Sequence, residues 1–251
     1  MSVVFENRVA LVTGAGTGVG RACALRFARL GYGVVINYSR SKADAEQTAN
    51  EVRQIGGHPL IYQCDVSDDQ CVNQMIQSVR DTFGRLDVVV NNAATTNFIS
   101  HEKLADLTES MWDRMFAVNV KGAYFVTRAA RELLGQTPGG AVVNIASVAG
   151  ITGSGSSIAY CATKGALITM TKSFARVLAP NVTVNAVCPG PIDSRWIREG
   201  NPEWDLEAMV ADYPIPKASS PDEVADAVLF FSTANRMATG QILSVDGGQT
   251  L

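Results

Sequence analysis

The sequence is poor in metal-binding residues and has no long apolar run. Its 251 residues include only two histidines, His58 and His101, which are far apart. No group of Asp and Glu residues has the spacing of a metal-binding loop, so we expect no resident metal. The longest apolar runs are a few residues, far below the roughly 20 needed to cross a bilayer. Residues 1–8 show no charged stretch followed by an apolar one, so no signal peptide is expected.

Charge is also scarce and evenly spread. Charged residues make up 18% of the chain, and 21 basic against 24 acidic residues give a net charge of -3. Binding to nucleic-acid phosphates needs clustered Lys and Arg, and a membrane-surface role needs a basic amphipathic helix. The sequence shows neither, so nucleic acid and membrane are not expected partners.

The cysteines do not form a disulfide framework. Their number is odd, and no two of them form a C-x-x-C pair. They are scattered along the chain as Cys23, Cys64, Cys71, Cys161 and Cys188. In a chain of this size, that pattern is typical of reduced thiols and predicts a cytoplasmic protein.

What the chain has in quantity is short apolar runs that alternate with segments of helical period. The runs are nearly continuous in Val, Ile, Leu and Ala, as in strands buried on both faces of a parallel sheet. They lie at Val9–Thr13, Gly33–Tyr38, Leu60–Cys64, Leu86–Asn91, Ala141–Ala146, Val182–Val187 and Gln241–Val245. The helical segments lie near residues 18–30, 42–56, 68–83, 109–134, 157–179 and 221–234. This alternation predicts a doubly wound α/β fold of three layers, the Rossmann fold, with a seven-stranded parallel sheet.

The chain shows no internal division. No repeat, proline-rich linker or low-complexity tract interrupts it, so residues 1–251 are expected to form a single domain. The stretch 193–217 lacks strand periodicity and contains three prolines. A connection of this length in a compact domain is usually a lid or a binding loop. Trp196 and Trp204 in this stretch are expected either to line a substrate pocket or to anchor the lid.

A glycine-rich segment directly follows the first predicted strand. Gly14, Gly18 and Gly20 have the spacing G-x-x-x-G-x-G, and Val19 stands where the more usual G-x-G-x-x-G needs a glycine. Glycines there allow a tight turn and a close approach of the backbone to a pyrophosphate, which the helix N-terminus attracts. The alternative is a tight turn that binds nothing. The predicted phosphate contacts are Gly14, Gly16, Thr17, Gly18, Val19 and Gly20.

The end of the second predicted strand indicates which dinucleotide binds. An acidic residue here commonly binds the ribose 2′-hydroxyl of NAD, whereas a basic residue accommodates the 2′-phosphate of NADP. Tyr38, Ser39 and Arg40 end the strand, and no Asp or Glu appears before Asp44. Arg40 and the serines beside it are placed for charge-assisted hydrogen bonds to a phosphate. This favours NADP(H) over NAD(H), with a solvated loop arginine as the alternative reading.

Tyr160 and Lys164 are four residues apart in a helical segment and therefore share one face. The pKa of a free tyrosine is near ~10. An ammonium about 4 Å away, at an effective dielectric constant near ~20, stabilises the phenolate by roughly 4 kcal/mol. We therefore expect Lys164 to lower the pKa of Tyr160 toward neutrality, so that the phenol exchanges a proton with a carbonyl or an alcohol. Such a pair alone is also common on ordinary helix surfaces.

Two further polar residues indicate the same chemistry. Ser147 follows the fifth predicted strand, at the sheet edge where parallel α/β folds bind ligands, and is placed to hold a substrate oxygen. Asn119 lies in the middle of a predicted helix and is expected to seat a water connected to Lys164. The alternative for Asn119 is an exposed or back-bonded amide. Ser147 lacks the G-x-S-x-G context of a hydrolase nucleophile, and Cys161 is expected to be a packed residue beside Tyr160.

Taken together, the motifs from Thr13 to Gly248 resemble those of the short-chain dehydrogenase/reductase family. The resemblance implies that Ser147, Tyr160 and Lys164 are catalytic and that Asn119 completes a proton relay. It also implies that Tyr160 and Lys164 contact the cofactor, with Lys164 on the nicotinamide ribose. The other implied cofactor contacts are Asp65 and Val66 near the adenine, Asn91 and Ala93 along the groove, and Pro189, Gly190, Ile192 and Ser194 at the nicotinamide end.

Within the family, the chain is similar to 3-oxoacyl-acyl-carrier-protein reductases and related ketoreductases. It departs from their pattern at three positions. Ala94 replaces the glycine of an Asn-Ala-Gly motif, Thr17 stands where NADP-dependent members often have arginine, and Ser194 stands where a threonine is common. None of these departures touches the expected catalytic residues.

The resemblance implies an NAD(P)(H)-dependent oxidoreductase that interconverts a carbonyl and a secondary alcohol. The expected substrate is a small-molecule carbonyl or alcohol, such as a 3-oxoacyl thioester or a small ketone, and the expected assembly is a homotetramer. A substrate carried on an acyl carrier protein would need a basic surface, for which Arg128, Arg131 and Lys172 are candidates. The competing hypothesis is a catalytically silent NAD(P)-binding sensor or scaffold.

Overall fold

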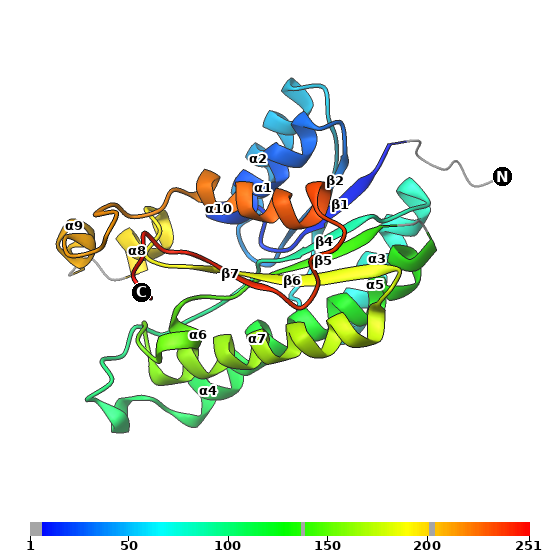
Figure 1. Ribbon diagram of the computed structural model, residues 1–251. Helices are drawn as coiled ribbons and strands as arrows, with labels where there is room; N and C mark the ends of the chain where they lie inside the picture. The colour runs from blue at the N-terminus through cyan, green and yellow to red at the C-terminus, as the bar shows by residue number, and fades with distance from the viewer. Residues whose placement is uncertain (1–6, 137–138, 201–203) are drawn as a thin grey trace.

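Parallel strands form the centre of the protein, in a computed structural model that describes residues 7–136, 139–200 and 204–251. In these ranges the sheet has seven strands in the order β3-β2-β1-β4-β5-β6-β7, and each neighbouring pair is parallel (Figure 1). The strands are β1 (Val9–Val12), β2 (Gly33–Tyr38), β3 (His58–Gln63), β4 (Val88–Asn91), β5 (Gly140–Ile145), β6 (Val182–Pro189) and β7 (Ile242–Val245). The strand order reverses between β1 and β4, which is where a doubly wound sheet leaves a crevice for a ligand.

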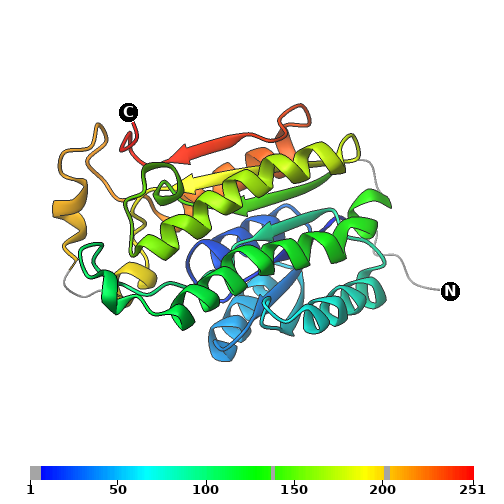
Figure 2. The same cartoon turned by 90° about the horizontal axis from the view of Figure 1, so that it is seen from below.

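Helices cover both faces of the sheet. The longer ones are α1 (Gly18–Arg29), α2 (Lys42–Gln54), α3 (Asp69–Phe83), α4 (Glu109–Phe116), α5 (Ala123–Gln136), α7 (Ile158–Leu178) and α10 (Pro221–Leu229). α1, α2 and α10 lie on one face, and α3, α5 and α7 lie on the other (Figures 1 and 2). The shorter helical elements are η1 (Leu104–Asp106), α6 (Ala149–Thr152), α8 (Arg195–Gly200), α9 (Leu206–Val210) and the π-helical turns η2 (Ala117–Gly122) and η3 (Phe230–Ala234).

The apolar core follows from side-chain alternation in buried strands. In β1, Ala10 and Val12 pack with α1 and α2, whereas Val9 and Leu11 pack with α3 and α5. All four residues are fully buried. Because successive side chains of a strand point to opposite faces, a continuous apolar run builds a core on each side of the sheet. The predicted three-layer fold with a parallel sheet is therefore confirmed.

The predicted helix over residues 109–134 is wrong in one respect. It is not a single α-helix, because the π-helical turn η2 separates α4 from α5. A π turn accommodates an extra residue, which apolar periodicity does not reveal, and such turns are frequent at functional sites. Asn119 lies in this turn rather than in a regular helix. The predicted helix at residues 221–234 likewise ends in a π turn, η3.

The predicted lid contains two short helices. α8 and α9 lie within residues 193–217, and residues 201–203 of that stretch are outside the described part of the chain, as are residues 1–6. The lid returns to the sheet through a bridge between Ile192 and Ser219. Among the described residues, no helix is long and apolar enough to span a bilayer.

Candidate active site

A cavity of about 780 Å³ opens at the carboxyl ends of the strands and beneath the lid. Ligands of doubly wound sheets bind at this edge, beside the reversal of strand order. Most of the predicted site residues line the cavity, although they come from all parts of the chain. They are Gly14, Gly16, Thr17, Gly18, Val19, Tyr38, Ser39, Arg40, Asp65, Val66, Ala93, Ser147, Tyr160, Lys164, Pro189, Gly190, Ile192 and Ser194.

The glycine-rich loop needs its glycines for steric reasons. Gly14 and Gly18 have φ of 63° and 54°, in the left-handed region that side chains disfavour. Gly20 does not line the cavity, but a Cβ there would lie 2.3 Å from the Gly14 oxygen and 2.6 Å from Asn92 Nδ2. Thr17 is the N-cap of α1, and its side chain accepts no cap hydrogen bond. Bare backbone and an open helix N-terminus therefore face the cavity, which suits a pyrophosphate.

The loop after β4 supports the glycine-rich loop. Asn92 Nδ2 donates to the Thr13 oxygen at 2.9 Å and to the Gly14 oxygen at 3.1 Å. The backbone N–H of Ala93 donates to Thr13 Oγ1 at 2.9 Å. Sequence reasoning did not single out Asn92, although it follows directly after a predicted groove residue. Its amide holds the glycine-rich loop in shape.

The expectation that Asn91 lines the groove is wrong. Its side chain is buried, and Nδ2 donates to Asn144 Oδ1 at 2.8 Å and to Thr127 Oγ1 at 3.0 Å. Because alternate residues of a strand face opposite sides, Asn91 points into the core, and the cavity wall begins at Asn92. The Asn91 amide ties β4 to β5 and α5.

The part of the cavity where the adenosine of a dinucleotide is expected is lined by residues at the ends of β2 and β3. Asn37 Nδ2 donates to the Cys64 oxygen at 3.0 Å, which joins these two strand ends. Ser39 and Arg40 line the cavity, and no carboxylate in the described part of the chain forms an ion pair with Arg40. A free guanidinium here is suited to a ribose 2′-phosphate.

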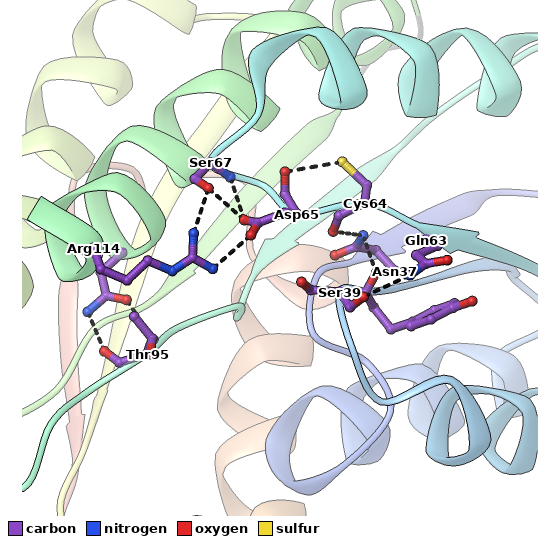
Figure 3. A network of polar contacts seen from close by, with 10 residues as sticks. Asn37, Ser39, Gln63, Cys64, Asp65, Ser67, Thr95 and Arg114 are labelled. Carbon is purple, nitrogen blue, oxygen red and sulfur yellow. Dashed lines mark hydrogen bonds and ion pairs between the residues drawn. The ribbon is translucent and has the colours of Figure 1, made fainter. Parts of the chain in front are cut away.

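Asp65 is held by a network that the sequence did not predict. Figure 3 shows Arg114 of α4 reaching Asp65 and Ser67, with Nη2 donating to Asp65 Oδ2 at 2.7 Å. The hydroxyl and the N–H of Ser67 donate to Asp65 Oδ1 at 2.7 and 3.0 Å. Burial would raise the pKa of Asp65, but the hydrogen bonds from Ser67 and Arg114 outweigh it and keep that pKa below its ordinary value. Asp65 is therefore a fixed carboxylate at the cavity wall.

Tyr160 and Lys164 lie in the first turns of α7 and meet Ser147, which follows β5, at the other end of the cavity. Lys164 Nζ is 5.5 Å from the centroid of the Tyr160 ring. It donates a hydrogen bond of 2.7 Å to the backbone oxygen of Ile145, and the lysine is only 2% exposed. The spacing in the sequence therefore brought these side chains together as predicted.

The expected lowering of the Tyr160 pKa is not found in the protein alone. Burial raises the pKa of Tyr160 to about 12, and a hydrogen bond with Ser147 offsets this only in part. Burial lowers the pKa of Lys164 to about 8. The sequence argument assumed a polar surrounding, whereas a site with few water contacts penalises both charged forms. At neutral pH the structure therefore holds a neutral phenol beside a buried ammonium.

Asn119 does not line the cavity, and it makes no hydrogen bond to Lys164. Its Oδ1 accepts from the Thr95 N–H at 2.8 Å, and its Nδ2 donates to the Thr95 oxygen at 2.9 Å. Nδ2 also donates to Thr163 Oγ1 at 3.0 Å. The amide thus joins the loop after β4 to α7, close to the Tyr160 turn.

An apolar wall closes the cavity on the lid side. Phe98 and Trp204 form an edge-to-face pair with ring centroids 5.2 Å apart, and Trp196 and Met209 also line the cavity. Both tryptophans of the lid therefore line the cavity, and Trp204 also attaches the lid to Phe98 of the loop after β4. Phe98 and Met209 carried no signal in the sequence, because single apolar residues in a loop or a short helix resemble ordinary core residues.

Other predicted features lie outside the cavity. None of the basic residues Arg128, Arg131 and Lys172 lines it, and Arg128 forms an ion pair with Asp69.

All five cysteines are free, and Cys161 is buried. In the part of the chain that the structure describes, no three His, Cys, Asp or Glu side chains gather in a way that could hold a metal.

Comparisons with known proteins find relatives over nearly the whole chain. The sequence profile of a family described as enoyl-(acyl carrier protein) reductase matches residues 14–250. Ketoacyl reductase 2 of the granaticin polyketide synthase of Streptomyces violaceoruber is 38% identical over 251 residues, which cover 98% of this chain and 97% of the relative. The 3-oxoacyl-[acyl-carrier-protein] reductase of Synechocystis is 36% identical and covers 97% of each chain. A Burkholderia xenovorans crystal structure described as a short-chain dehydrogenase/reductase has a TM-score of 0.91 at 34% identity and covers 97% of this chain and 98% of its own.

Proposed function

The chain belongs to the short-chain dehydrogenase/reductase family and is an oxidoreductase that acts on CH–OH groups, and we propose that it reduces a ketone by using Tyr160 as the acid. The observation that carries this proposal is the meeting of Ser147, Tyr160 and Lys164 in the cavity that also contains the glycine-rich loop. A phosphate-binding loop and a proton donor at opposite ends of one cavity suit a dinucleotide and a small substrate.

The family uses a nicotinamide dinucleotide, and the residues present fit one. Gly14, Gly16 and Gly18 present backbone without side chains to the cavity, where we propose that the pyrophosphate lies. Gly20 lets α1 pack closely on this loop, since a Cβ there would collide with the Gly14 oxygen. When bound, the dinucleotide supplies or accepts the hydride. Arg40 and Ser39 support NADP(H) as the preferred form, because they offer a cation and a hydroxyl where NAD-specific sites commonly have a carboxylate.

The proton transfer is assigned to Tyr160. Its phenol is protonated at neutral pH because burial raises its pKa to about 12, so it donates in the reduction direction. We propose that Ser147 holds the substrate oxygen by a hydrogen bond and that Lys164 stabilises the phenolate that remains. Asn119 fixes the turn beside Thr163 and is proposed to support the path by which Tyr160 regains a proton.

The wall of the cavity supports an apolar substrate. Phe98, Trp196, Trp204 and Met209 line the same cavity as Ser147 and Tyr160, and their side chains offer little to a charged group. We propose a ketone with an apolar substituent or a 3-oxoacyl thioester, the class that the names of two relatives indicate for those proteins.

Assembly and compartment are also proposals. We propose a homotetramer, as is common in the family, and light scattering after size exclusion tests it. We propose a cytoplasmic location because all five cysteines are free, and fractionation of the source cells tests it.

The decisive experiment is a panel of apolar ketones and 3-oxoacyl thioesters, each assayed with NADPH and with NADH. Oxidation of NADPH that depends on the ketone is the expected result. If nucleotide binds and no ketone of the panel is reduced, the silent sensor or scaffold is the better description. If NADH is strongly preferred, the interpretation of Arg40 is wrong.

A further inference from the structure

An ion pair joins the lid to the first turn of α2. Arg195 begins α8, directly after Ser194, and Asp44 lies in the first turn of α2, 151 residues earlier. Arg195 Nη2 donates to Asp44 Oδ2 at 2.9 Å, and Nη1 donates to Oδ1 at 3.3 Å. Two parallel hydrogen bonds between a guanidinium and a carboxylate fix the relative orientation of the two groups and strengthen their attraction.

Asp44 is packed directly on the glycine-rich loop. A Cβ at Gly16 would lie 3.2 Å from the Asp44 Cβ and 3.2 Å from the Ala45 nitrogen. Arg195 and Gly16 both line the cavity. The pair therefore joins the lid to the loop at which the pyrophosphate of a dinucleotide is expected.

The other polar contacts of the lid stay on its own side of the cavity. Arg198 pairs with Asp193 at 2.6 Å inside the lid, and Lys217 pairs with Glu223 at 2.9 Å. Among the described residues, the pair of Arg195 and Asp44 is the one ion pair that joins residues 193–217 to the chain before β6. Breaking it would release α8 from the adenosine half of the site.

We infer that Asp44 is a positioning residue that, through Arg195, holds α8 over the bound dinucleotide, and that opening of this latch limits how fast the dinucleotide leaves. This inference rests on the dinucleotide site of the proposed function. The side chains of Arg195 and Asp44 are 47% and 29% exposed, so water and salt weaken the pair. A latch of this kind opens readily, and release of product is a common slow step in enzymes that close a lid.

The test measures the rate constant of NADPH release by stopped-flow fluorescence, with excess unlabelled NADP as the competitor. Arg195→Gln and Asp44→Asn are each expected to speed release about two- to fivefold, the range of a partly exposed ion pair. The double variant is expected to release NADPH no faster than either single variant. Arg195→Lys, which keeps the charge, is expected to restore part of the slow release. The variant Arg198→Gln breaks the pair inside the lid and is the matched control, with release as in the wild type.

Asp44→Asn separates the latch from a simple effect of charge. If only long-range electrostatics mattered, removing the negative charge of Asp44 would reduce its repulsion of the phosphates and slow NADPH release. Loss of the latch is instead expected to speed NADPH release. Raising salt should accelerate release from the wild type more than from the double variant, because screening weakens the pair. Unchanged or slower release from Asp44→Asn would overturn the latch while leaving the proposed function intact. Failure of the wild type to bind any nicotinamide dinucleotide would overturn the proposed function, and the latch with it.

Discussion

Lys164 Nζ donates a 2.7 Å hydrogen bond to the backbone oxygen of Ile145, nineteen residues earlier in the chain. This bond places an ammonium against the end of β5, where it is 2% exposed. Burial lowers the pKa of Lys164 to about 8, so keeping this lysine charged at neutral pH reduces the free energy of unfolding. The buried ammonium of Lys164 therefore lowers the stability of the fold and at the same time lies beside the proposed acid, Tyr160.

Replacing Lys164 with methionine is expected to stabilise the apoprotein at pH 7 and to abolish catalysis. An unfolded lysine has a pKa near ~10.4, so below pH 8 the folded state carries the full cost of burying the charge. That cost falls as pH rises from about 8 to ~10.4, because the folded state loses its proton first. We expect a gain of roughly 1–3 kcal/mol in the free energy of unfolding at pH 7, shrinking by pH 10. Urea unfolding at both pH values measures it, with the exposed Lys172→Met as the control.

Ketone reduction is expected to slow above pH 8. Deprotonation of Lys164 removes the cation that stabilises the Tyr160 phenolate, while Tyr160 itself keeps its proton, since its pKa is about 12. The profile of kcat/KM against pH reports ionisations of the free enzyme. Tyrosinate absorbance of the wild type minus that of Tyr160→Phe identifies the group, and a phenolate signal appearing near pH 8 would contradict the assignment to Lys164.

Tyr160→Phe is expected to lower turnover about 10²- to 10⁴-fold, the usual contribution of a positioned acid. The ring still fills its place in α7, so NADPH binding should change little. Turnover by steady-state assay and affinity by fluorescence titration check the two statements separately. Tyr124→Phe, on the exposed part of α5, serves as the control. Near-normal turnover in Tyr160→Phe would remove Tyr160 from the mechanism.

Gly20→Ala is expected to weaken dinucleotide binding severely and to destabilise the fold. Its Cβ would lie 2.3 Å from the Gly14 oxygen, which is closer than atoms can approach, so the loop or α1 must shift. Gly135→Ala in α5 meets nothing within 4 Å and is the matched control. Titration calorimetry with NADPH compares the affinities of the two variants, and thermal unfolding compares their stabilities. Equal NADPH affinities would show that the loop has room for a side chain at position 20.

Arg40→Ala is expected to weaken NADPH binding about 10- to 100-fold, as for loss of a charge-assisted hydrogen bond. NADH, which lacks the 2′-phosphate, should bind with nearly unchanged affinity. Titration with both dinucleotides measures the ratio, and Arg53→Ala at the end of α2 controls for a general change in charge. If both affinities fall together, Arg40 does not read the 2′-phosphate.

The parts of the site that the sequence predicted are those set by local rules. Tyr160 and Lys164 share a helix face by their spacing, and Ser147 reaches them because parallel strands end at one edge of the sheet. The glycine-rich loop was found for the same reason, since the motif and its position after a strand are both local.

The parts that sequence reasoning missed depend on distant contacts or on small shifts of the backbone. Arg114 and Asp65 are 49 residues apart, and nothing in either stretch indicates the other. The π turn η2 adds a residue to a helix without a change in composition, and it turns Asn119 toward Thr95. Asn92 lines the cavity and Asn91 does not, because a single residue decides which side of a strand end faces the cavity. Exposure of Tyr160 and Lys164 to water, which sets their pKa values, also depends on the whole fold.

The loop after β4 has a further consequence for how such a protein can change over generations. Asn92 and Ala93 form hydrogen bonds back to the loop that follows β1, whereas Thr95 and Thr96 bind forward to η2 and to the segment before α7. Ala94 therefore lies between two blocks of sequence, one with the residues proposed to select a dinucleotide and one with those proposed to select a substrate. A recombination event at this point exchanges one block without the other, and it succeeds only where the new partner keeps the ion pairs that cross it, Asp44 with Arg195 and Asp65 with Arg114.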